Sequence, residues 1–282
     1  HARRRLDEVE EWAQLFRANE APPVYGLRDI RKAVQYAERD GVLVAEDLEA
    51  VGRNCDVVAR VSRFFQTRAE RAPLLSGVGA LLDPCDDLRG AVEIAIEPGG
   101  RISDNASPDL RRLRRTVQNH TDRLKASVER LLRSEQFENY LQDDYFTVRE
   151  DRYVLPVRVA AKNTVAGIVH GYSSSGQTAF IEPQELVDLN NELRWAQIEV
   201  EEEEKRILTR LSGLVKRFAD PLLRNSEVIA YLDLTGAIAL AYASLALSGL
   251  TAQWPLAAMR LTAELDDQKL ALHQLHAALA RG

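Results

Sequence analysis

The sequence predicts a mainly α-helical protein in which a helical base carries two long antiparallel lever helices with a small antiparallel β clamp at their tip. Helix-favouring Ala, Leu, Arg and Glu dominate the composition, whereas aromatic residues make up 6% of it. Apolar residues recur at three- and four-residue steps along most of the chain, which is the period of an amphipathic helix. Alternation of apolar and polar residues, the period of a strand, is confined to residues 144–183.

Residues 1–105 are expected to form the helical core at the base. Apolar residues at helical spacing begin at Val9 and Trp12 and continue in several short runs. Pro22–Pro23 and Asp40–Gly41 break these runs as turns, so the helices between them are expected to be short.

Residues 106–143 are expected to form the outgoing lever helix, after Pro98-Gly99-Gly100 ends the base. The tripeptide Ser-Pro-Asp at 107–109 supplies an N-cap, a proline at the first helical position and an acid in the first turn. An apolar stripe then advances by roughly 3.5 residues per turn, the repeat of a helical pair, and no breaking residue follows until about Gln142. The stripe consists of Leu110, Leu113, Val117, Leu124, Val128 and Leu131.

Residues 144–183 are expected to form the β clamp. The segment contains runs rich in β-branched and aromatic residues, which indicates four short antiparallel strands. The runs are Tyr145–Val148, Tyr153–Val159, Thr164–Tyr172 and Thr178–Ile181. The polar connections between them are Glu150–Asp151, Ala161–Asn163 and Ser173–Gln177.

Residues 184–248 return to the helical period and are expected to form the returning lever helix. A heptad seam of leucines begins the segment, which favours pairing with the outgoing lever as a coiled coil. Pro221 is predicted to kink or break the helix because proline removes a backbone donor and clashes with the preceding turn. Gly249 and Pro255 end it, and residues 249–282 remain as a linker.

Composition bounds the class of protein. The 282 residues are 45% hydrophobic and 28% charged, which is typical of a soluble, cytoplasmic protein, and no apolar run approaches the roughly 20 residues of a membrane span. The formal net charge of −6 argues against a surface that binds nucleic acid over its whole extent, but it allows a local basic site.

Cys55 and Cys85 lie outside any CxxC motif and are interpreted as reduced core thiols. The chain begins at His1 without a secretory signal, so we expect a region of a larger cytoplasmic protein.

Candidate catalytic motifs lack groups that their chemistry needs. Residues 171–178 fit the phosphate loop G-x-x-x-x-G-K-[ST], except that Gln177 replaces the lysine and a strand follows instead of a helix. His170 and Ser173–Ser175 suggest a hydrolase, but the sequence places no carboxylate to orient the histidine. We therefore predict that this chain has no catalytic residue and binds no cofactor or metal, and we keep a small hydrolase as a minor alternative.

Two further clusters resemble metal sites without meeting the requirements. His273 and His276 can share a helix face, but two histidines without further ligands are weak evidence. Glu199 and Glu201–Glu204 point around the axis of a helix, so a solvated face is expected.

The clamp contains candidate residues for contacts to nucleic acid. They combine cations with small hydrogen-bond donors, which suits phosphate contacts without base readout. The candidates are Arg149, Arg152, Arg158, Lys162, Asn163, Ser173, Ser174, Ser175 and Gln177. Polar turn residues without any ligand would show the same pattern, so both interpretations stay open. A second basic cluster within residues 111–115 is interpreted as a solvated helix face.

Several motifs of the sequence together resemble the signature of the type-two MutS family. Arg152-Tyr-Val-Leu-Pro-Val-Arg158 leads to Gly167-Ile-Val-His-Gly171, and Ser175-Gly-Gln-Thr-Ala-Phe-Ile-Glu-Pro183 follows. Asn190-Asn-Glu-Leu193 and the Glu-rich helix after it also fit the pattern. Upstream, residues 26–30 and 107–113 are similar to the family's N-terminal region.

The resemblance implies a core, paired lever helices and a β clamp of a mismatch-repair-like protein without the mismatch-reading domain. In longer members a Walker-type ATPase follows the levers and a Smr nuclease domain often follows that, so residues 249–282 are expected to begin the ATPase domain. ATP and Mg²⁺ are expected only in that domain, and the homodimer is expected to form mainly through it. The chain itself is therefore expected not to be an enzyme.

The resemblance also implies two functions. In the first, the clamp binds DNA, including branched or recombination intermediates, in repair and anti-recombination. In the alternative, the same region contacts ribosomal RNA or protein on stalled or collided ribosomes. A cation that contacts phosphate serves either function, so the sequence leaves them open.

Overall fold

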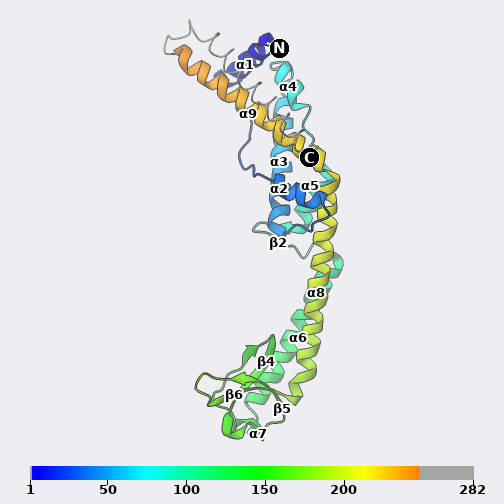
Figure 1. Cartoon of the computed structure of the whole chain (residues 1–282), viewed down its shortest axis with the longest axis vertical. Helices are drawn as coiled ribbons and strands as arrows, with labels where there is room; N and C mark the ends of the chain where they lie inside the picture. Colours follow the sequence, from blue (N-terminus) through cyan, green and yellow to red (C-terminus); the bar gives the residue numbers. More distant parts are fainter. Residues whose placement is uncertain (1, 248–282) are drawn as a thin grey trace, which may run out of the picture. The chain divides into compact units, whose positions relative to one another are not determined.

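The computed structural model describes residues 2–247 and confirms that the protein is mainly α-helical (Figure 1). The chain divides into two compact units. Of the described residues, 2–93 and 211–247 belong to the first unit, and 94–210 belong to the second. The predictions for 249–282, with His273 and His276, lie outside the described residues. Within the described part, no helix combines the length and apolar character that crossing a membrane requires.

The helices of the first unit pack around an apolar core. They are α1 (Ala2–Arg17), α2 (Arg31–Glu38), α3 (Ala45–Gln66), α4 (Pro73–Gly79), α5 (Asp86–Ala95) and α9 (Ala219–Leu247). Trp12 of α1, Phe65 of α3 and Leu232 of α9 are almost completely buried together in this core. The indole N–H of Trp12 donates to the hydroxyl of Thr235 at 3.0 Å, so the buried ring keeps its hydrogen bond.

Buried polar side chains fix the helix ends of the first unit. The carboxylate of Glu11 accepts from the backbone N–H groups of Leu74 and Leu75, at 3.0 and 2.9 Å. These two donors lie in the first turn of α4 and have no partner inside the helix, so Glu11 caps it from α1.

Burial and a hydrogen bond to Glu8 raise the pKa of Tyr231 to about 12.

The second unit combines helices with two antiparallel sheets. Its elements are β1 (Ile96–Glu97), β2 (Arg101–Ile102), α6 (Pro108–Leu132), α7 (Glu135–Glu138), β3 (Thr147–Arg149), β4 (Arg152–Arg158), the short 3₁₀ helix η1 (Val159–Ala161), β5 (Gly167–Tyr172), β6 (Thr178–Pro183) and α8 (Gln184–Arg217). The last residues of α8 belong to the first unit.

Helices α6 and α8 run antiparallel within the second unit. The Ser107 hydroxyl donates to Glu203 at 2.8 Å, and Arg123 donates to Glu192 at 3.2 Å. Residue numbers of the partners on α8 therefore decrease as those on α6 increase, which is the antiparallel arrangement that the sequence predicted. Ser107 also accepts from the N–H of Leu110 at 3.0 Å, as expected of an N-cap.

The clamp sheet has the order β3-β4-β6-β5, and each neighbouring pair is antiparallel, as the sequence predicted. Leu155 of β4 and Ile181 of β6 are buried in one cluster with Leu124 of α6 and Leu186 of α8. This core holds the sheet against the helical pair, so the helices determine which face of the sheet is covered.

The outgoing helix ends earlier than predicted. α6 stops at Leu132, whereas the sequence shows no breaking residue before about Gln142. Residues 140–142 run beside β4 instead: the Arg158 N–H donates to the Tyr140 carbonyl at 2.9 Å, and the Gln142 N–H donates to the Pro156 carbonyl at 2.8 Å. In residues 140–142, hydrogen bonds to the edge of β4 replace those of a helix. These bonds depend on tertiary structure, so local helix propensity does not predict them.

Two further breaks have local causes. α8 ends at Arg217 and α9 begins at Ala219, so Pro221 lies in the first turn of α9, where its missing N–H is not needed. This confirms the predicted break near the proline. Pro98-Gly99-Gly100, predicted to end the base, instead forms the turn of the small β1–β2 hairpin, with φ of +92° and +72° at the two glycines.

Candidate nucleic-acid interface

The register of the clamp sheet divides the predicted contact residues into two groups. Arg152 and Arg158 are the two ends of β4, so about 20 Å of strand separates them. Arg158 pairs with Thr178 of β6, whereas Arg152 pairs with Arg149 of β3. We call the first group the serine-loop end: Arg158, Lys162, its neighbour Asn163, and residues 173–177. We call the second group the hairpin end: Arg149 to Arg152.

The serine loop, residues 173–177, is a tight turn held by its own backbone. The Gly176 N–H donates to the Ser173 carbonyl, and the Ser173 N–H donates to the Thr178 carbonyl, both at 2.9 Å. Gly176 has a φ of +70°, which glycine adopts without a Cβ clash. The Ser173 hydroxyl is used within the turn, where it accepts from the Thr178 N–H at 3.1 Å. The polar side chains that stay exposed are those of Ser174, Ser175 and Gln177.

Two cations flank the serine loop. Arg158 is exposed, and the N–H of the next residue, Val159, donates to the Gln177 carbonyl at 3.0 Å, which fixes this end of β4 beside the loop. The Lys162 ammonium lies 5.6 Å from the centre of the Tyr172 ring, and the face of an aromatic ring weakly attracts a cation. Among residues 2–247, neither Arg158 nor Lys162 takes part in a salt bridge. Their charges are therefore available to an external anion.

The hairpin end has a different electrostatic character. Glu150 and Asp151 form its two-residue turn with φ of +49° and +62°, the geometry of a type I′ hairpin. Arg149 lies with its guanidinium carbon 4.4 Å from the centre of the Phe180 ring. The two acids stand between the two arginines in the chain, so this end carries no net basic charge.

Arg152 is committed to a buried carboxylate. Its guanidinium donates to Glu182 at 2.6 Å and to the Asn191 side-chain carbonyl at 2.7 Å. Glu182 is completely buried, so it requires such partners to remain charged. Arg152, one of the predicted contact residues, therefore joins β4 to β6 and α8 through its hydrogen bonds.

His170 shares the same carboxylate. Its Nε2 lies 2.7 Å from the second oxygen of Glu182. The expectation that no carboxylate orients this histidine was therefore wrong: the strand pairing of β5 with β6 brings Glu182 to it. The serines of the loop follow the C-terminal end of β5, and among the described residues His170 contacts Glu182 and Glu150 rather than these serines, so His170 and the serines do not form a hydrolase triad.

Asn190 completes the network from α8. Its amide accepts from the Tyr153 N–H at 2.9 Å and donates to Glu182 at 2.9 Å, while Asn190 itself is fully buried. Polar residues of the four motif segments thus converge on one carboxylate. A charged residue inside the apolar run of β6 was the sequence signal for this network, because such a residue needs partners from neighbouring elements.

The other charged clusters are largely paired. Arg114 donates to Glu204 at 2.7 Å and also bonds Asp104, so this half-buried arginine departs from the solvated helix face expected for residues 111–115. Glu203 departs from the expected solvated acidic face, since it is buried and accepts from Ser107. Cys55 and Cys85 are buried free thiols, as predicted. A hydrogen bond with Cys85, together with burial, raises the pKa of Cys55.

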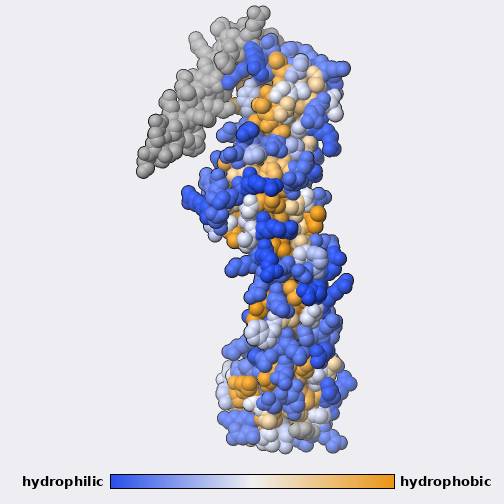
Figure 2. Space-filling view, turned by 90° about the vertical axis from the view of Figure 1, so that its right-hand side faces the viewer, coloured by the Kyte–Doolittle hydropathy of each residue, from blue (hydrophilic) through white to orange (hydrophobic). Residues whose placement is uncertain are grey.

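The surface of the clamp is mixed in character. On the face drawn in Figure 2, hydrophilic residues surround apolar patches at the lower end of the view, where the clamp lies. Large apolar side chains of the clamp that are substantially exposed include Val148, Ile168, Val169 and Tyr172. Because the chain has a formal net charge of −6, attraction of an anion to this surface depends on local groups of cations.

Comparisons with known proteins identify relatives along most of this chain. It is 36% identical over 230 residues to the endonuclease MutS2 of Pelotomaculum thermopropionicum, which covers 82% of this chain and 29% of the relative. It is 38% identical over 232 residues to the endonuclease MutS2 of an Anaeromyxobacter species, with the same two coverages. The endonuclease MutS2 of a Geobacillus species is 33% identical over 230 residues, covering 80% and 29%. No protein-family model matches the chain.

The length of the match qualifies what these relatives show. The chain spans less than a third of the length of the MutS2 proteins that it matches. The agreement in sequence extends over about four fifths of the chain itself, so it is not confined to the clamp motifs. The chain is therefore a MutS2-like protein region, similar to MutS2 over a segment that makes up 29% of those relatives.

Proposed function

We propose that the second unit binds nucleic acid through phosphate contacts at the serine-loop end. One observation carries the proposal: Arg158 and Lys162, which form no salt bridge among the described residues, flank a turn with exposed hydroxyl and amide groups. Such groups donate to phosphate oxygens and do not read the bases. The relatives are named endonucleases, and an endonuclease acts on nucleic acid, which fits a binding module of this kind.

We infer that DNA, including branched DNA, is the substrate class and that this region binds it without catalysing a reaction. In this proposal, ATP hydrolysis, nuclease activity and their ATP and Mg²⁺ belong to parts of the relatives that the chain does not match. Homodimer formation belongs there as well. The resemblance of the clamp motifs to the type-two MutS signature supports this division.

The test is a fluorescence-anisotropy titration of the chain with duplex, branched and single-stranded DNA at several salt concentrations. The variant combines Arg158→Glu with Lys162→Glu. Because each lost phosphate contact removes close to one released counterion, the slope of log affinity against log salt should become shallower by about two. The affinity itself should fall by about tenfold or more at moderate salt.

A matched control reverses two exposed cations on α6, Lys125→Glu with Arg130→Glu, and changes the net charge by the same amount. It should retain most of the affinity if the contact is local. Equal losses in both variants would show that only the net charge matters and would contradict the proposal. If the chain binds no DNA but sediments with ribosomes, the ribosomal function would replace the one proposed.

A further inference from the structure

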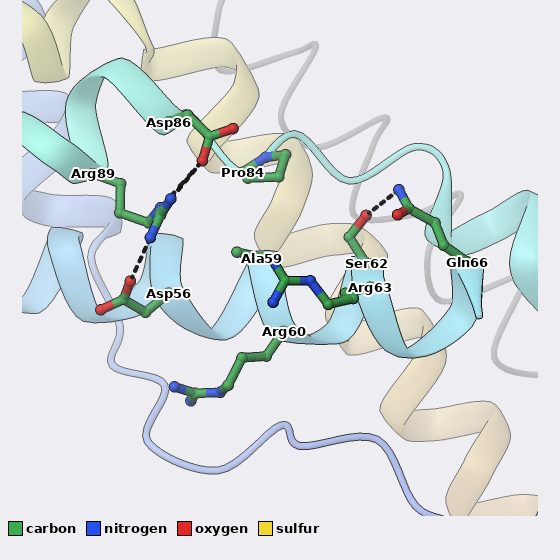
Figure 3. A pocket seen from close by; sticks show the side chains of 9 residues that line it. All are labelled: Asp56, Ala59, Arg60, Ser62, Arg63, Gln66, Pro84, Asp86 and Arg89. Atoms are coloured by element: carbon green, nitrogen blue, oxygen red, sulfur yellow. Dashed lines mark hydrogen bonds and ion pairs between the residues drawn. The ribbon is translucent and has the colours of Figure 1, made fainter. Parts of the chain in front are cut away.

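A polar groove in the first unit lies between one face of α3 and the start of α5 (Figure 3). Its volume is about 360 Å³, whereas a single water needs about 10–15 Å³ of such space. Apart from Ala59 and Pro84, the residues that line it carry polar or charged side chains. The groove therefore has room and donors for a polar ligand larger than water.

One end of the groove contains two carboxylates and one guanidinium, a net charge of −1. Arg89 donates to Asp86 at 2.8 Å, and a longer contact of 3.5 Å joins it to Asp56 (Figure 3). The hydrogen bond to Asp86 is the main cause that raises the pKa of Arg89. The two carboxylates hold this guanidinium in place, so it forms a fixed wall and contributes little free charge.

The other end carries cations and donors without an acid. Ser62 and Gln66 of α3 lie at this end in Figure 3, and the side chain of Arg63 extends from beside them along α3 toward Ala59. The Gln66 amide donates to the Ser62 hydroxyl oxygen at 3.2 Å, which leaves the hydroxyl proton free for another acceptor. Within residues 2–247, no salt bridge involves Arg63. Arg60, one helical turn earlier, extends away from Arg63 in Figure 3, and its guanidinium carbon lies 5.4 Å from the centre of the Tyr25 ring.

We propose that this groove is a phosphate-binding site, with Arg63 as the principal contact and Ser62 and Gln66 as further donors. A tetrahedral oxyanion accepts hydrogen bonds from several directions, and these donors come from successive turns of one helix face. The guanidinium group presents several N–H donors in a fixed plane that suits phosphate oxygens. The guanidinium of Arg89 at the far end is paired with Asp86, so the positive charge offered to a ligand is that of Arg63. The site is independent of the clamp and of the function proposed for it.

The test uses the whole chain and inorganic phosphate as the probe. Thermal unfolding is followed at increasing phosphate concentrations, with chloride added to keep the ionic strength constant, and the shift in midpoint gives the affinity. Arg63→Gln should weaken phosphate binding by about tenfold, since it removes a charge-assisted hydrogen bond. Arg53→Gln is the matched control: Arg53 is an exposed arginine of α3 outside the groove. The NMR signal of the Arg63 side-chain N–H reports the contact directly.

Saturable binding that Arg63→Gln weakens and Arg53→Gln preserves would support the site. No saturable binding, or an equal loss in both variants, would overturn it. A short DNA duplex, titrated in the Arg158→Glu and Lys162→Glu background, distinguishes the source of the phosphate. A dependence of duplex affinity on Arg63 indicates a nucleic-acid phosphodiester, whereas phosphate binding without that dependence indicates a free phosphate ligand.

Discussion

The two ends of the clamp sheet use the same residue types for different purposes. Arg152 and Arg158 are the two ends of one strand and, with an even spacing, share one face of it. Arg152 meets the fully buried Glu182 and side chains from α8, whereas Arg158 meets the exposed serine loop. The difference teaches that strand position alone does not decide whether an arginine stabilises the fold or is free to contact a ligand. The neighbouring elements decide it.

The largest effect is expected at the hairpin end, from Glu182→Gln. This change replaces the buried carboxylate beside Arg152 and His170 with a neutral amide. The Arg152 guanidinium then has no opposite charge at this position. Breaking a buried ion pair by removing one partner costs about 3–5 kcal/mol. Urea denaturation should show this loss in the free energy of unfolding. The exposed Glu185→Gln on α8 should change it by less than about 0.5 kcal/mol, and similar losses in both variants would break the comparison.

A smaller effect should separate the two arginines. Arg152→Gln leaves Glu182 its hydrogen bonds to His170 and Asn190, so it should lower the free energy of unfolding by less, about 2 kcal/mol. Arg158→Gln should leave stability within about 0.5 kcal/mol and weaken DNA binding several-fold instead. Urea denaturation and anisotropy titration, performed on both variants, check this. A loss of stability in Arg158→Gln, or a specific loss of binding in a folded Arg152→Gln, would reverse the assignment of the two ends.

The smallest effect is expected in the serine loop itself. Gly176→Ala introduces a Cβ at a φ of +70°, where no other heavy atom lies within 4 Å, so the cost is backbone strain without a clash. This strain is about 1 kcal/mol, measurable by chemical denaturation. Gly213→Ala, inside α8 and also without a close neighbour, should instead stabilise by roughly 0.5–1 kcal/mol. If both changes acted in the same direction, the left-handed turn would not be the cause.

The sequence by itself determined the order and type of the main elements. Helical spacing around Trp12 marked a residue that the structure buries, and alternation in 144–183 identified four antiparallel strands. The Ser107 cap and the break near Pro221 follow from local backbone chemistry, which a short stretch of sequence contains in full. The nine predicted contacts of the clamp remain predictions as contacts to nucleic acid.

Only the tertiary structure decided which polar residues are free. Residues 140–142 left the helix because an open stretch of β4 offered them ladder bonds, and no local signal describes that edge. Glu182 collects Arg152, His170 and Asn190 from three other elements, so their roles depend on contacts between residues distant in the sequence. Hydrogen bonding and burial are properties of such contacts, whereas period and capping are properties of the local chain. The sequence therefore supplied the polar residues of the clamp, and the packing of β4, β5, β6 and α8 divided them between the core and the surface.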